Sequence, residues 1–327
     1  MTDITAQLIC EFKLKPLQVQ NTIKLINEGC TIPFIARYRK ELTGELDDQI
    51  LRELYERLVY LRNMEARRED VRRLIDEQGK MTPEISKVLN GCKSLQEIED
   101  IYRPFKPKRR TRASIAREKG LEPLADILYS QELHAGTVEE VAVPYIDEEK
   151  GVNSIDDALA GAMDIIAEKV SDNADIRKAV REMFYRHGVL VSRAQKEEDS
   201  VYRLYYDFSE PVSRIAKHRV LAINRGEKEE FLRVGIDLPE ELIIEYLKSK
   251  IVKKNKSITS EYVERAVEDA FGRLIEPSIY NEVRNELTEM ASEQAMKVFA
   301  ENLRNLLLQP PVKGRVVLGL DPAYRTG

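Results

Sequence analysis

The chain has 327 residues, of which 33% are charged and 43% hydrophobic, and its formal net charge is −5 at pH 7. This length is enough for two or three domains, each with its own core. High charge with few glycines and prolines favours a soluble, mainly helical protein, and the negative total charge means that nucleic-acid binding would have to come from local basic patches. No apolar run approaches the roughly 18 residues that span a bilayer, so we expect a cytoplasmic protein that does not enter a membrane.

The spacing of the cysteines and histidines indicates no disulfide framework, metal site or catalytic site. The cysteines are odd in number and lack C-x-x-C spacing, which favours small buried residues over a disulfide framework or a zinc site; they are Cys10, Cys30 and Cys92. The histidines lie far apart and none is at ligand spacing from another histidine or a cysteine; they are His134, His187 and His218. Walker, dinucleotide-binding and nucleophile-elbow patterns are also lacking. We therefore expect no enzyme, cofactor or metal site.

The first third of the chain predicts a succession of helices. One is opened by Pro16 and closed by Gly29, and the next covers Ile32 to Lys40. The helical spacing of this second helix places Arg37 and Lys40 on one face and Tyr38 roughly opposite. The layout is similar to a helix-turn-helix, although many three-helix bundles share it. The candidate phosphate contacts in this part are Arg37, Arg39 and Lys40.

A long helix is expected from Asp47 to Gln78, because the first carboxylates complement the helix dipole and Gly79 follows the end. Its first half carries a coiled-coil-like apolar seam formed by Leu51, Leu54, Leu58 and Leu61. Beyond this point the seam positions become Glu65 and Arg68, so the packing partner must change or the helix must enter solvent. The mixed charges of the second half predict a solvated face with ion pairs inside the helix.

The densest positive segment runs from Tyr102 to Arg117, and we call it the basic strap. It contains seven basic residues and no acidic one: Arg103, Lys106, Lys108, Arg109, Arg110, Arg112 and Arg117. Pro104 and Pro107 favour extended geometry, so the segment should be an ordered strap rather than a helix. Tyr102 and Phe105 alternate with the cations, as in surfaces that bind phosphates and stack bases. The charge pattern fits equally an external nucleic-acid surface and an internal brace docked on an acidic helix of the same chain.

The rest of the chain again predicts helices, with a soft domain boundary near residue 190. Short strands are expected near Val189 and Phe231, and the aromatic cluster between Tyr202 and Phe208 is interpreted as core packing under a short helix. Two long helices follow, roughly over 260–276 and 278–308, and we expect the break between them at Pro277.

Several unusual segments in collinear order resemble the bacterial Tex family of transcription accessory proteins. They are Ile32 to Gly44, Tyr102 to Ala113, Ala116 to Leu124, His218 to Glu227 and Val316 to Gly327. The resemblance covers essentially the whole chain. It implies that the chain is the N-terminal part of a longer protein, in which the strand expected at Arg315 to Leu320 begins a YqgF-like domain of RNase H fold. Helix-hairpin-helix and S1 modules would follow that domain, and the S1 module would be the main nucleic-acid reader.

The predicted fold is all-α, or mainly α: a multi-helix bundle with a helix-turn-helix-like N-terminal part, long helices and minor short strands. The predicted domains are a Tex N-terminal-like helical domain (1–190), a central helical domain (191–314) and the first strand of a truncated YqgF-like domain (315–327). As the resemblance implies, we expect a non-catalytic part of a transcription-associated, RNA-binding protein. It would make weak, non-specific phosphate contacts with RNA or DNA, position later domains and meet the transcription or translation machinery. The alternatives are part of an RNase H-like nuclease that uses Asp321, and a purely structural interaction scaffold.

Overall fold

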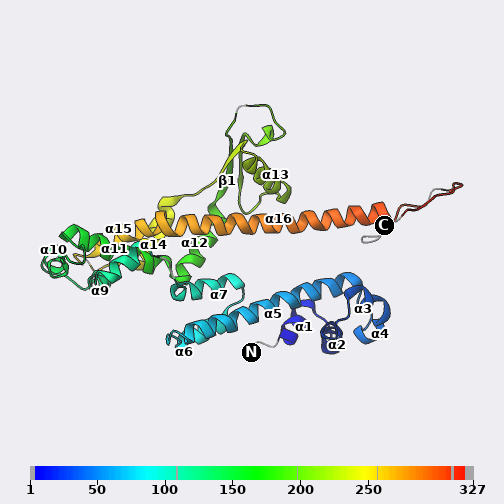
Figure 1. Cartoon of the computed structure of the whole chain (residues 1–327), viewed down its shortest axis with the longest axis horizontal. Helices are drawn as coiled ribbons and strands as arrows, with labels where there is room; N and C mark the ends of the chain where they lie inside the picture. The colour runs from blue at the N-terminus through cyan, green and yellow to red at the C-terminus, as the bar shows by residue number, and fades with distance from the viewer. Residues whose placement is uncertain (1–3, 108–109, 197, 256, 311–312, 321–327) are drawn as a thin grey trace. The chain divides into compact units, whose positions relative to one another are not determined.

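The computed structural model describes residues 4–107, 110–196, 198–255, 257–310 and 313–320, and these form mainly helices (Figure 1). The predicted fold class is therefore confirmed. The chain divides into two compact units, each made of two segments. The first unit contains Met1–Ala179 and Ile244–Ile275, and the second contains Val180–Ile243 and Glu276–Gly327. The domain limits expected from the sequence stay a prediction.

The first unit begins with four short helices followed by a long one. These are α1 (Ile4–Phe12), α2 (Pro16–Asn27), α3 (Ile32–Tyr38), α4 (Lys40–Thr43) and α5 (Asp48–Asp76). Pro16 occupies the first turn of α2, where its missing N–H costs no hydrogen bond, and the Asp47 side chain caps α5 by accepting from the Ile50 amide at 2.8 Å. Ile35 of α3 and Leu51 of α5 are fully buried in one apolar cluster, which fixes α3 against α5.

The rest of the first unit is helical too, and α11 lies at its centre. Its elements are α6 (Pro83–Gly91), α7 (Leu95–Tyr102), η1 (Arg103–Phe105), α8 (Arg112–Glu118), α9 (Glu122–Ser130), α10 (Val138–Ala142), η2 (Val143–Tyr145), α11 (Ile155–Ser171), α15 (Ser260–Asp269) and the π-helical turn η4 (Ala270–Ile275). Helices α8, α9 and α15 all pack on α11. Gly161 permits the approach of α8 and the turn after it, since a Cβ there would lie 2.4 Å from a methyl carbon of Leu121.

The second unit combines a small antiparallel sheet with two helices. Its strands are β1 (Val189–Ala194), β2 (Asp207–Pro211) and β3 (Leu232–Asp237) in the order β2-β1-β3, with the short turn η3 (Arg203–Tyr205) before β2. Leu190, the second residue of β1, pairs with Glu210 and with Ile236. Helix α13 (Lys217–Lys228) packs on α16 (Glu276–Leu307). Two helices contribute residues to both units: α12 (Ala174–His187) and α14 (Glu240–Ile251).

Several local predictions are confirmed. The long helix α5 lies within the predicted limits, and the seam residues from Leu51 to Leu61 are buried. Strands occur near Val189 and Phe231, and Tyr202 is buried with its ring centroid 5.8 Å from that of Phe231, as expected for core packing.

Other local predictions are wrong. The basic strap is not extended throughout, because α7 continues to Tyr102, η1 follows, and a reciprocal side-chain cap between Thr111 and Ser114 begins α8. The break between the long helices comes from η4, before Pro277, and the proline lies in the first turn of α16, where it is tolerated. The residues around Val316 that the structure describes are not a strand. Asp321 lies outside the described residues.

Candidate nucleic-acid interface

Three cations of the basic strap form ion pairs within the first unit. They are Arg103 with Asp172 (3.5 Å), Lys106 with Glu99 (2.6 Å) and Arg117 with Glu168 (2.6 Å). Glu99 belongs to α7, the helix that precedes η1. Glu168 belongs to α11 and Asp172 directly follows α11, so both are distant from the strap in the sequence. For these three residues, the contacts agree with the internal-brace interpretation of the strap.

The aromatic residues of the strap are also engaged within the fold. Tyr102 is buried, and its ring lies near two cations, 5.4 Å from the guanidinium carbon of Arg67 and 5.6 Å from the Lys106 ammonium. Both cations donate to Glu99. Burial alone raises the pKa of the Glu99 carboxyl, but these two hydrogen bonds outweigh burial and hold its pKa below the usual range. Tyr102 is therefore a structural ring that cannot stack a base in this conformation.

Two other strap cations, Arg110 and Arg112, face solvent. They flank Thr111, whose hydroxyl caps α8 by accepting from the Ser114 amide at 3.0 Å. Within the described part of the chain, no carboxylate lies at ion-pair distance from either guanidinium. Lys108 and Arg109 lie outside the described residues. The strap thus contains a paired set and, at the start of α8, an exposed set of cations.

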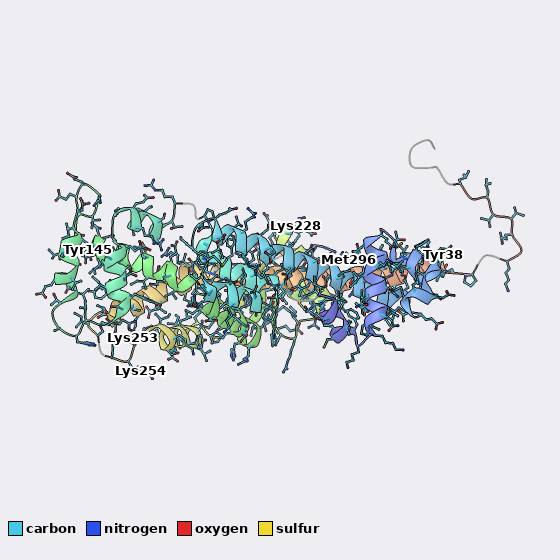
Figure 2. The ribbon with its side chains drawn as sticks, turned by 90° about the horizontal axis from the view of Figure 1, so that it is seen from below. Tyr38, Tyr145, Lys228, Lys253, Lys254 and Met296 are labelled. Atoms are coloured by element: carbon cyan, nitrogen blue, oxygen red, sulfur yellow. The ribbon has the colours of Figure 1, made fainter. Side chains whose placement is uncertain are left out.

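A group of exposed residues lies on α3, on α4 and between them, and we call it the α3 surface: Phe34, Arg37, Tyr38, Arg39 and Lys40. None of its three cations has a carboxylate at ion-pair distance among residues that the structure describes. The guanidinium carbon of Arg39 lies 5.0 Å from the Phe34 ring centroid, and the ring centroids of Phe34 and Tyr38 are 5.3 Å apart. Figure 2 labels Tyr38, which is 64% exposed.

The sequence indicates the cations of the α3 surface as candidate phosphate contacts but does not indicate its aromatic part. Helical spacing places Tyr38 roughly opposite Arg37 and Lys40, and base stacking is expected at the strap instead. The i, i+4 spacing of Phe34 and Tyr38 was the available signal, because this spacing puts two side chains on one helix face. The buried side chain of Ile35 packs in one cluster with Leu51 of α5 and so fixes which face of α3 is buried. The rings of Phe34 and Tyr38 are left at the surface.

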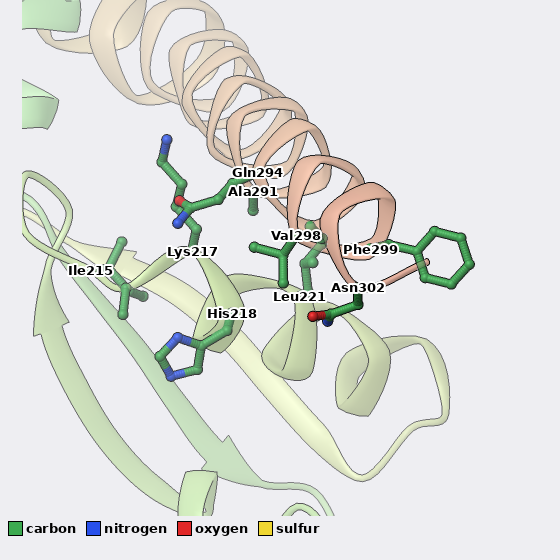
Figure 3. A pocket seen from close by; sticks show the side chains of 11 residues that line it. Ile215, Lys217, His218, Leu221, Ala291, Gln294, Val298, Phe299 and Asn302 are labelled. Atoms are coloured by element: carbon green, nitrogen blue, oxygen red, sulfur yellow. The ribbon is translucent and has the colours of Figure 1, made fainter. Parts of the chain in front are cut away.

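A cavity of about 650 Å³ in the second unit lies between α16 and the start of α13 (Figure 3). Its lining is mostly apolar. Val298 and Leu221 point into the space between the helices, whereas the Phe299 ring points away from it. His218 has no carboxylate or thiol beside it among the lining residues. This cavity therefore lacks the paired groups that general acid-base or nucleophilic catalysis uses.

No grouping of three or more His, Cys, Asp or Glu side chains suited to a metal ion occurs in the described part of the chain. The described helices also include none that is long and apolar enough to span a membrane.

Comparison with known proteins finds two matching family descriptions. Residues 2–76 match the Tex-like protein N-terminal domain, and residues 134–299 match the Tex central region. The chain is 45% identical to YdcI of Bacillus subtilis over 98% of its own length and 45% of the relative. It is 38% identical to the protein tex of Bordetella pertussis, over 99% of the chain and 43% of that protein. The human S1 RNA-binding domain-containing protein 1 is 31% identical over 96% of the chain and 33% of the relative. The chain thus spans less than half the length of these relatives.

Proposed function

The chain belongs to the Tex family, and from this premise we propose that it is the non-catalytic, helical portion of a cytoplasmic, transcription-associated protein that binds nucleic acid. The names of two relatives support this direction: one is called a transcriptional accessory protein and another an S1 RNA-binding domain-containing protein. In our proposal the chain makes weak, sequence-independent contacts with RNA or DNA phosphates. It also positions later modules, including a YqgF-like domain and an S1 domain, and approaches the transcription or translation machinery.

The observation that carries this proposal is the exposure of unpaired cations on the α3 surface. Arg37, Arg39 and Lys40 follow one another closely in the chain, and within the residues described none is neutralised by a carboxylate of the fold. A cation held by a carboxylate must break that pair before it binds a phosphate, whereas a free surface cation only displaces water and counterions. Arg110 and Arg112 are also exposed and offer a second, smaller contact, in which Arg112 already interacts electrostatically with the Asp164 carboxylate.

A specific set of contacts also supports a structural role for part of the strap. Arg103, Lys106 and Arg117 join η1 and α8 to carboxylates elsewhere in the first unit, so we assign them to the internal brace. The nuclease alternative rests on Asp321 alone, and nothing in the described residues favours it.

The test uses fluorescence anisotropy of the 327-residue chain with several unrelated RNA and DNA oligomers at physiological salt. We expect dissociation constants of about 10⁻⁴ to 10⁻⁶ M with little dependence on sequence, because non-specific electrostatic contacts give affinities of this order. Replacing Arg37, Arg39 and Lys40 together by Ser should weaken binding to all oligomers alike. Nanomolar affinity for one sequence, or no binding to any oligomer, would contradict the proposal.

A matched control removes the same charge elsewhere. Arg52, Arg73 and Arg203 are exposed, and each forms an ion pair with a carboxylate four residues away in the sequence. Their joint replacement by Ser changes the net charge of the chain as much as the α3 variant does. It should leave binding nearly unchanged if contacts, rather than total charge, decide affinity.

A further inference from the structure

The α3 surface contains aromatic rings in an arrangement that leaves one of them free. Phe34 and Tyr38 are separated by one helical turn, and their ring planes are tilted by 45°. Arg39 lies over the Phe34 ring and donates to the Tyr38 carbonyl oxygen at 3.0 Å. Phe34 therefore has both Arg39 and Tyr38 beside it and is 37% exposed, whereas Tyr38 is 64% exposed. Tyr38 is the more exposed of the two rings, and its neighbours in the chain, Arg37 and Arg39, are exposed as well.

We propose that the α3 surface binds single-stranded nucleic acid, with an unpaired base stacked on the Tyr38 ring and adjacent phosphates held by Arg37, Arg39 and Lys40. This inference rests on the proposed function and narrows it to one class of ligand. An aromatic ring beside cations matches both parts of a single strand, since every base has a π-face and every nucleotide a phosphate. In a duplex the base faces are covered by their neighbours, so a duplex could use only the cations.

The contrast with the basic strap strengthens the assignment to α3. Tyr102 also has basic neighbours, Arg67 and Lys106, but its ring is buried and both cations are bound to Glu99. Tyr38 has neither restraint, and its hydroxyl and ring do not serve the core, which α3 enters through Ile35. The charge of the α3 surface also favours an anionic ligand. Its three cations are accompanied by one carboxylate on α4, that of Glu41, so the surface attracts a polyanion more strongly than a neutral or basic partner.

A direct test exploits the lack of tryptophan in the chain. The variant Tyr38→Trp would carry the only indole, at the position proposed to stack. We expect its fluorescence to be quenched by a single-stranded oligouridine. An abasic strand with the same number of phosphates should leave it unquenched. The control variant is Phe299→Trp, because Phe299 is similarly exposed at 68% and lies on α16 of the other unit; its fluorescence should not respond. Equal quenching by the abasic strand would overturn the proposal.

Affinity measurements distinguish this inference from the proposed function. The Tyr38→Leu change should weaken binding to oligouridine by about 5-fold to 100-fold, the effect that loss of one stacked base produces. Binding to duplex DNA should not change, and Tyr38→Phe should behave like the wild type because it keeps the ring. If Tyr38→Leu binds oligouridine normally while the Arg37, Arg39 and Lys40 variant binds weakly, stacking is refuted and the phosphate contacts stand. If the wild-type chain binds no nucleic acid, both proposals fail and the surface belongs to a protein partner.

Discussion

Replacing the buried Arg68 is the sharpest test of how the first unit is held together. Arg68 lies in the second half of α5, where the seam of leucines has ended, yet only 2% of it is exposed. Its Nε donates to the Leu89 carbonyl oxygen at 3.1 Å and its Nη2 to that of Cys92 at 3.0 Å. It also forms an ion pair with Glu65. Arg68 thus satisfies carbonyl groups at the C-terminal end of α6, where cations are favoured.

The magnitude follows from these contacts. A hydrogen bond to a charged group contributes about 1.5 to 3 kcal/mol net, and Arg68→Met removes two of them at buried carbonyls. Methionine restores much of the packing and avoids burying a charge, so we expect a loss of about 3 kcal/mol in the free energy of unfolding. The control is Arg73→Met, which alters an exposed side chain of the same helix and should leave stability nearly unchanged.

Hydrogen exchange measured by mass spectrometry is the suitable assay, because a chain of two units need not unfold in one step. Peptides from α5 and α6 should exchange faster in Arg68→Met than in the wild type. Peptides from the sheet of the second unit serve as an internal reference. If exchange in α5 and α6 is the same for Arg68→Met and Arg73→Met, the two carbonyl contacts do not stabilise the unit as argued.

Three further predictions concern single residues. Burial raises the pKa of the Cys92 thiol to about 11, so iodoacetamide at pH 8.5 should alkylate the exposed Cys10 and leave Cys92 unmodified until the chain is unfolded, as read by mass spectrometry. Gly188→Ala should destabilise the second unit by about 1 to 3 kcal/mol in urea unfolding, because the new Cβ would lie 2.3 Å from the Phe184 carbonyl oxygen; wild-type stability would contradict this. The lowered pKa of Glu99 means that its stabilising effect is present above the unfolded-state pKa and is lost as the pH falls through the folded-state pKa. Glu99→Gln should therefore flatten the acid side of the stability profile, and an unchanged profile would exclude this role.

Local sequence signals were enough to predict most helices. Pro16 begins α2, Asp47 caps α5, and Ser94 caps α7 by accepting from the Glu97 amide at 3.2 Å. These signals act within one turn of the chain, so they can be read without knowing the tertiary structure. The start of α8 has an equally local signal, the cap at Thr111, but the two prolines of the strap favour extended geometry just before it, so the sequence predicts a strap there instead of a helix.

Other features depend on residues that are distant in the sequence. The sequence does not reveal that Arg117 binds Glu168, 51 residues away, or that Arg68 reaches the end of α6. The division of the strap into paired and exposed cations follows from such contacts, so charge density alone could not decide between a brace and an interface. The candidate cations of the α3 surface are exposed and their role stays a prediction, whereas the exposure of Tyr38 depends on how α3 turns to bury Ile35.

The salt dependence of binding tests the central claim most directly, because it counts the phosphates that a protein neutralises. On a single strand the slope of log affinity against log salt is about −0.7 for each phosphate contact. If Arg37, Arg39 and Lys40 each contact a phosphate, their replacement by Ser should make the slope less steep by about 2. The control variant at Arg52, Arg73 and Arg203 should keep the wild-type slope. An unchanged slope in the α3 variant, or an equal change in the control, would contradict the account.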